Sequence, residues 1–195
     1  SNTKKKMNES KKIIQYINIA HFIDHYAMLI FPAAVIVIAP FFNMSYAELL
    51  PYATPGFIAF GAGSLLTGWL GDKWSRRNMM LIFFFGMGLA LGSITLIQTP
   101  FQLGIVLLFI GLMASIYHPV GTAMLSSHAD KLGREMGING VWGNIGVASS
   151  ALCTGVINQY FGWRISFLIP AVLCLFIGFL FLRNILITVD KILKK

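Results

Sequence analysis

Three ionisable side chains interrupt the first apolar run of the sequence. His21, Asp24 and His25 follow one another at i, i+3 and i+4, so they share one face of a helix. Asp24 lies eleven residues past Ile13, a rise of about 16 Å, which places its carboxyl group near the middle of a bilayer. An ionisable group at that depth costs roughly 3 kcal/mol and normally faces a partner or a water-filled cavity. We therefore expect this face to bind a solute or protons.

A second polar group stands in the fourth apolar run. His118 is expected at a depth similar to that of His21, across the same cavity and beside Tyr117. Histidine titrates near physiological pH, which suits coupling to protons. Asn144, in the fifth run, is a further candidate for contact with the solute. For each of these residues the alternative is a hydrogen bond between helices that only holds the bundle together.

Metal binding and catalysis are the other chemistries open to such residues. Two imidazoles and a carboxylate can bind a transition metal, yet His21, Asp24 and His25 have no fourth ligand and no cysteine beside them. We expect no metal cofactor or other cofactor, and a transition-metal or iron-related cargo stays an alternative. An enzyme is not expected, because no nucleophile is paired with a base.

The composition indicates that these residues are held by membrane helices. The 195 residues are 56% hydrophobic and 11% charged, against about 25% charged in soluble domains. The formal net charge of +8 is confined to loops and termini, so anionic lipid is the expected partner and nucleic acid is not. Six apolar runs are each long enough to cross a bilayer. We place these runs at Ile13–Phe42, Tyr46–Leu70, Asn78–Gln98, Phe101–Leu125, Gly137–Tyr160 and Trp163–Leu182.

The basic residues predict the orientation of the spans. All 15 Lys and Arg residues except Arg164 fall in segments on one side, which the positive-inside rule makes the cytoplasmic side. Both termini are then cytoplasmic. Residues 1–12 form a basic N-terminus, residues 13–183 the bundle, and residues 184–195 an amphipathic tail or the start of a linker between domains.

The turn between the second and third spans carries a distinctive motif. It combines a glycine, an aspartate and three basic residues, namely Gly68, Asp72, Lys73, Arg76 and Arg77. This pattern resembles the signature of the major facilitator superfamily, with Ser75 where a glycine is usual. The turn Gly162-Trp163-Arg164 resembles another common to that superfamily, at the corresponding repeat position on the opposite side.

The resemblance implies an all-α fold of six helices in a 3+3 inverted repeat, which is the N-terminal half of a transporter. It implies a secondary active carrier that moves a small solute by alternating access, together with a second six-helix half. Asp72 would meet a helix end of that half and close the cytoplasmic side, with Lys73, Arg76, Arg77 and Arg134 in the charge network.

A narrower resemblance rests on two short stretches. Ala114–Pro119 and Trp142–Gly146 are similar to fosmidomycin-resistance-type and magnetosome-type transporters, which implies efflux or an undefined solute and a bacterial cytoplasmic membrane or one derived from it. In the fifth span, glycines recur at every third position and predict close helix packing. They are Gly137, Gly140, Gly143 and Gly146. The antiporter glycine–proline pair is absent there, so symport and uniport stay open.

No second half follows within the 195 residues. We expect an excised N-terminal domain, with a natural half-size protein or one piece of a split transporter as alternatives. The functional expectation is a carrier, which in the first case would not transport as an isolated chain. Its rival is a non-transporting module that assembles with itself or a partner chain.

Overall fold

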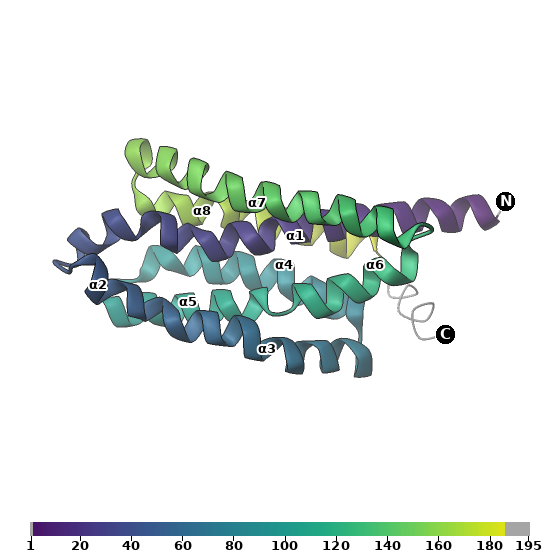
Figure 1. Ribbon diagram of the computed structural model, residues 1–195, viewed down its shortest axis with the longest axis horizontal. Coiled ribbons are helices and arrows are strands. Elements are labelled where there is room, and N and C mark those ends of the chain that lie inside the picture. The colour runs from purple at the N-terminus through teal and green to yellow at the C-terminus, as the bar shows by residue number, and fades with distance from the viewer. Residues whose placement is uncertain (1, 186–195) are drawn as a thin grey trace.

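The computed structural model describes residues 2–185, and this part of the chain is all-α. Six helical runs are long and apolar enough to cross a membrane, and they lie side by side along the long axis of the molecule (Figure 1). The prediction of six spans is confirmed. The runs are Thr3–Phe41, Tyr46–Lys73, Arg76–Leu96, Pro100–His128, Leu132–Phe161 and Trp163–Asn184. Most of the predicted amphipathic tail, residues 186–195, lies outside the described residues.

The first helix, α1, is longer than predicted. It runs from Asn2 to Phe41, and its 40 residues span about 60 Å at 1.5 Å per residue. The predicted start at Ile13 marked only the beginning of the apolar run. The preceding residues are mostly good helix formers such as Lys, Met and Glu, and extending an existing helix costs little once it is nucleated. The basic N-terminal segment therefore continues α1.

The second span is divided by prolines. It consists of α2 (Tyr46–Leu49), a 3₁₀ turn (Leu50–Ala53) and α3 (Thr54–Lys73). Pro51 opens the 3₁₀ turn and Pro55 lies in the first turn of α3, where a missing backbone N–H costs least.

The fourth span, predicted as one run from Phe101 to Leu125, is interrupted at its centre. It consists of α5 (Pro100–Ala114), a π turn (Tyr117–Gly121) and α6 (Thr122–His128). Pro119 has no backbone N–H, so it cannot bond the carbonyl of Ser115 four residues earlier. The Thr67 hydroxyl of α3 donates to that carbonyl instead, at 2.9 Å. The interruption presents Tyr117 and His118 toward α1.

Three helices complete the bundle. They are α4 (Arg76–Gly92), which continues as a 3₁₀ turn to Leu96, α7 (Leu132–Phe161) and α8 (Trp163–Asn184). Gly162 separates α7 from α8 with φ of 87°, a left-handed conformation that glycine adopts without steric cost.

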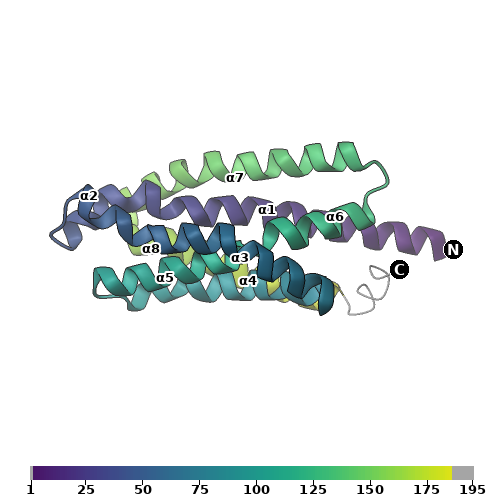
Figure 2. The ribbon, with the colours of Figure 1, turned by 60° about the horizontal axis from the view of Figure 1, so that its bottom comes forward.

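The helices pack unevenly. α1 packs along α7, α4 against α8, and α3 against α5, with α1 lying between α7 and the α3–α5 pair (Figure 2). In the most apolar stretch of α1, 56% of residues are buried, whereas the corresponding shares for the spans that contain α3 and α7 are 17% and 22%. α3 and α7 thus expose most of their apolar surface to whatever surrounds this chain.

Within residues 2–185, all basic residues but one lie at one end of the bundle. The start of α1, the α3–α4 turn, the α6–α7 turn and the end of α8 lie together there (Figure 1). Arg164, at the start of α8, lies at the opposite end.

Candidate functional site

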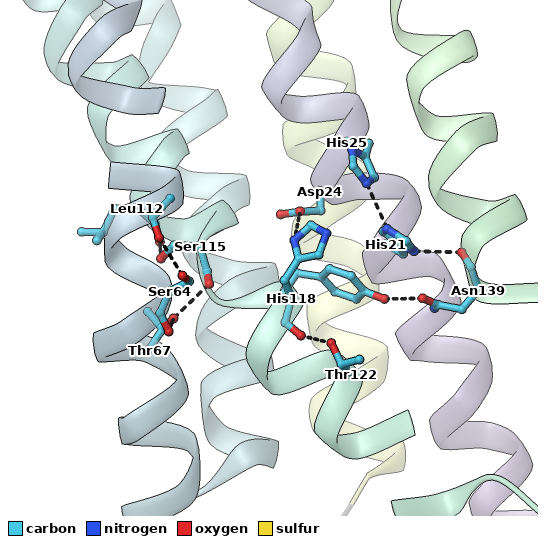
Figure 3. Close-up of polar contacts among 12 residues, drawn as sticks. His21, Asp24, His25, Ser64, Thr67, Leu112, Ser115, His118, Thr122 and Asn139 are labelled. Atoms are coloured by element: carbon cyan, nitrogen blue, oxygen red, sulfur yellow. Dashed lines mark hydrogen bonds and ion pairs between the residues drawn. The ribbon is translucent and has the colours of Figure 1, made fainter. Parts of the chain in front are cut away.

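The polar side chains of α1 and the π turn meet inside the bundle (Figure 3). His21 and His25 lie one helical turn apart, with their Nε2 atoms 2.9 Å from each other. The ring of His118 stands edge-on to both, at 5.6 Å between ring centroids in each case. Asp24 lies on the other side of His118, whose Nδ1 is 3.4 Å from the Asp24 Oδ2. The structure thus brings together the four ionisable residues that the sequence singled out.

Asp24 and His118 differ sharply in exposure. The Asp24 side chain is fully buried, and within the described chain neither of its oxygens has a hydrogen-bond partner. The His118 side chain is 48% exposed and packs edge-on against Phe60 of α3. The cluster therefore extends from the inside of the bundle to its surface, where a solute or an ion can reach it.

Asn139 of α7 fixes the orientation of the His21 and Tyr117 rings. Its backbone carbonyl lies 2.8 Å from Nδ1 of His21, which makes that nitrogen the donor and leaves Nε2 facing His25. Its side-chain oxygen accepts a hydrogen bond from the Tyr117 hydroxyl at 2.7 Å, and its amide donates to Asn18 at 2.9 Å. The Tyr117 ring stacks on the His21 ring at 4.6 Å. One asparagine thereby ties three segments of the bundle together.

Two of the four glycines that recur at every third position of α7 allow this arrangement. A Cβ atom at Gly143 would lie 2.6 Å from Nε2 of His21, and one at Gly146 would clash with the backbone carbonyl of Phe22. Gly137 and Gly140 face open space, because no other part of the described chain comes within 4 Å of the place where a Cβ would stand. The close packing predicted for all four residues is therefore seen at Gly143 and Gly146, against α1.

Asn18 and Asn139 are site residues that the sequence interpretation missed. Both are buried amides in apolar helices, and Asn18 shares a helical face with His21 and His25 at i, i+3 and i+7. Asn139 likewise continues the Gly143 and Gly146 stripe. Asn144, a candidate for contact with the solute or for a hydrogen bond between helices, is exposed on α7 and is not brought into the cluster.

The motif between α3 and α4 forms its contacts within this chain. Arg76 pairs with Asp72 at 2.9 Å, one turn away. Arg77 is buried, and its guanidinium donates to the carbonyls of Ile185 and Leu182 at the end of α8. Gly68 lies against Pro119 of the π turn, while Lys73 is the last residue of α3.

Arg134, which was expected to join the charge network of this motif, pairs instead with an acidic residue of its own helix. Arg134 lies 3.8 Å from its neighbour Glu135, at the start of α7. Both residues line a cleft of about 430 Å³ between the start of α1 and the α6–α7 turn.

Among residues 2–185, three imidazoles form a group that could hold a metal ion. One ring nitrogen from each of His21, His25 and His118 lies within 4.8 Å of the others. The alternative set considered from the sequence, His21, Asp24 and His25, had Asp24 as a ligand, whereas the structure places Asp24 behind His118.

Comparison with known proteins agrees with this architecture. Residues 17–192 match the profile of the Major Facilitator Superfamily. The uncharacterized MFS-type transporter YqjV of Bacillus subtilis (strain 168) is 32% identical over 138 residues, which are 67% of this chain and 32% of that protein. The chain spans about a third of the length of the curated relatives that it matches.

Solved structures show the same fold. The proton:xylose symporter XylE, bound to 6-bromo-6-deoxy-D-glucose, is similar over 89% of this chain and 44% of that one, with a TM-score of 0.75 and 16% identity. The POT family transporter PepTSo is similar over 87% of this chain and 36% of that one, with a TM-score of 0.72 and 16% identity. The six helices match one half of such folds, and the profile covers nearly the whole sequence. This chain is therefore an integral membrane protein that belongs to the Major Facilitator Superfamily, a family of transporters and not of enzymes.

Proposed function

We propose that the chain is the N-terminal half of a secondary transporter that moves a small solute by alternating access. The observation that carries the proposal is the polar cluster of His21, Asp24, His25 and His118, which reaches the surface of a bundle whose flanking helices α3 and α7 are mostly unburied. Buried ionisable groups in membrane helices serve a pathway far more often than they serve packing.

The partner in this proposal is a second six-helix bundle, supplied by the same gene product, a second copy or another chain. Alternating access requires two bundles that move around a central site. The chain matches 44% of the XylE chain, which is the share that one half would cover. The isolated half is then expected to bind solute without transporting it.

Protons are the proposed driving ion. One of the similar structures is a proton:xylose symporter, so the same fold supports that coupling in another protein. The proposed orientation puts the basic end of the bundle, with the start of α1 and the end of α8, in the cytoplasm of a bacterial cell or on the matching side of an internal membrane. The narrower resemblance to fosmidomycin-resistance-type carriers belongs to the same proposal and makes efflux one direction to test, beside the uptake that proton symport would drive.

The test is uptake into proteoliposomes that contain the complete transporter, with and without an imposed pH gradient. Accumulation of a solute that depends on the gradient supports the proposal. A complete transporter that equilibrates no solute under either condition, from a library of small anions, sugars, drugs and metal ions, would contradict it.

Asp72 provides a matched test of the cytoplasmic closure. Asp72→Asn removes the charge that would favour a helix N-terminus of the second half, a contact worth up to about 1 kcal/mol, so transport should fall about fivefold with the protein still present in the membrane. Glu9→Gln, at an exposed position on the same end, should leave transport unchanged. Equal transport by the Asp72 variant and the wild type would remove this residue from the gate.

A further inference from the structure

The three histidines of the cluster have a separation and orientation that suit a metal ion. Nε2 of His21 and Nε2 of His25 lie 2.9 Å apart. Two nitrogens on one tetrahedral zinc ion, each at about 2.05 Å, lie about 3.3 Å apart, so this pair is already close to the required spacing. The widest separation in the triad is 4.8 Å, so closure on an ion needs about 1.5 Å of ring movement.

In two of these rings the other nitrogen faces an oxygen atom of the kind that a metal-bound histidine donates to. A metal-bound histidine donates its second ring N–H to a carbonyl or a carboxylate, which fixes the tautomer and directs the lone pair at the metal. Nδ1 of His21 bonds the carbonyl of Asn139 at 2.8 Å. Nδ1 of His118 faces the Asp24 carboxylate at 3.4 Å, which leaves Nε2 of His118 on the side of His21 and His25 (Figure 3).

A bound cation would explain why the Asp24 carboxyl group is buried. It is fully buried, and within the described chain its oxygens have no hydrogen-bond partner. A carboxylate in that position is costly unless a positive charge lies nearby. A dication on three neutral imidazoles would supply that charge through His118, in a carboxylate–histidine–metal arrangement.

The surroundings leave a route and a free coordination position. His118 is half exposed, so an ion can approach from the surface that faces the proposed second bundle. Tyr117 stacks on His21 and Phe60 packs edge-on against His118, so each of these two rings has an aromatic neighbour. Three protein ligands leave the fourth position of a tetrahedral ion to water or to a chelating solute.

We propose that His21, His25 and His118 bind one divalent late transition-metal ion of the Zn²⁺, Co²⁺ and Ni²⁺ kind, with Asp24 orienting His118 from behind. Imidazole nitrogen is a preferred ligand of these ions. That the ion is the cargo, alone or with a chelating solute, is a further step that rests on the proposed transport function. The binding itself does not depend on transport.

The test is titration of the 195-residue chain with Co²⁺ in lipid nanodiscs, after purification without a polyhistidine tag. The expected result is one bound Co²⁺ per chain, with the strong visible absorption of tetrahedral cobalt. Added Zn²⁺ should displace the Co²⁺ and abolish this absorption. His25→Gln and His118→Gln should each weaken binding by about tenfold or more, and Asp24→Asn by about tenfold. His128→Gln is the matched control, because His128 lies at the end of α6 and bonds the Met124 carbonyl.

A variant that keeps a ligand atom separates metal binding from folding. His118→Cys should bind again, with its preference moved from Co²⁺ toward the thiophilic ion Cd²⁺, which a purely structural role for His118 would not produce. No saturable Co²⁺ binding by the wild-type chain would overturn the proposal. Binding by His25→Gln and His118→Gln as tight as that of His128→Gln would also overturn it.

These outcomes are independent of the transport assay. The titration is made at equilibrium with no gradient, so its failure leaves the proposed carrier in place with another solute. Intact binding in a complete transporter that moves nothing would instead contradict the proposed function.

Discussion

Tyr117 and Asn139 show how single residues set the shape of the site. The Tyr117 hydroxyl donates to the Asn139 side chain at 2.7 Å in a buried environment, while its ring covers His21. The ring contact and the hydrogen bond can be separated by mutation. The hydrogen bond holds the π turn against α7, and the ring contact holds His21 in its orientation.

Tyr117→Phe should lower stability by about 1 kcal/mol, because the ring stays while Asn139 loses a buried donor. Tyr16→Phe is the matched control, since the Tyr16 hydroxyl accepts a hydrogen bond from Asn184 at an exposed site and its loss should cost less. Thermal denaturation midpoints of both variants in one detergent measure the difference. A Tyr117 variant as stable as the Tyr16 variant would contradict the role given to this bond.

Gly143 is required by the position of the His21 ring. Gly143→Ala places a methyl group 2.6 Å from Nε2 of His21. We expect this overpacking to lower the free energy of unfolding by about 1–3 kcal/mol. Gly140→Ala, three residues away with open space around it, should instead gain about 0.5–1 kcal/mol as alanine is the better helix former. The same denaturation assay decides, and a similar response of both variants would contradict the close contact.

At the scale of elements, two arginines secure the pairing of α4 with α8 at its two ends. Arg77 donates to the carbonyls of Leu182 and Ile185, where α8 ends. Arg164 donates to the carbonyl of Ile97 at the other end, and its guanidinium lies over the rings of Phe41 and Trp163. Helix ends leave carbonyls without intrahelical partners, and a guanidinium can satisfy several of them at once.

Arg77→Lys keeps the positive charge but loses the planar guanidinium that bonds two carbonyls. It should lower the free energy of unfolding by about 1–3 kcal/mol. Arg76→Lys affects a partly exposed pair with Asp72 and should cost less than about 1 kcal/mol. Denaturation midpoints again provide the measurement. An Arg77 variant no less stable than the Arg76 variant would show that the Arg77 hydrogen bonds do not stabilise the end of α8.

The elements were predictable from the sequence where hydrophobic runs decide them. The six spans follow from apolar length, and the four ionisable residues of the site follow from their presence in those spans. The π turn did not follow, because a proline in a membrane helix is tolerated or disruptive according to which group bonds the freed carbonyl. Here Thr67, 48 positions away from Ser115 in sequence, supplies that bond.

The sequence also did not show which side chains contact one another across neighbouring helices. Asn139 and Asn144 are both amides on the same helix, and only the rotation of α7 about its axis decides which one reaches His21. The two glycines that touch α1 fix that rotation, and they lie on the same stripe as Asn139. The periodicity of the glycines was visible, but their partner helix was not.

At the scale of the whole molecule, the uneven burial of the helices indicates where a second bundle would lie. α3 and α7 belong to the least buried spans, and the histidine cluster lies between them on α1 and the π turn. A second bundle placed against that side would enclose the cluster in a cavity at mid-membrane. The proposed transport function requires that this cavity hold water and not lipid.

Thiol labelling of the complete transporter in its membrane tests this most directly. In a background where Cys153 and Cys174 are replaced by alanine, His118→Cys should react with a water-soluble maleimide many times faster than Phe84→Cys, a position buried in the core. Both variants should label equally after denaturation. A cysteine at position 118 that reacts no faster than one at position 84 would contradict the cavity and the function proposed for it.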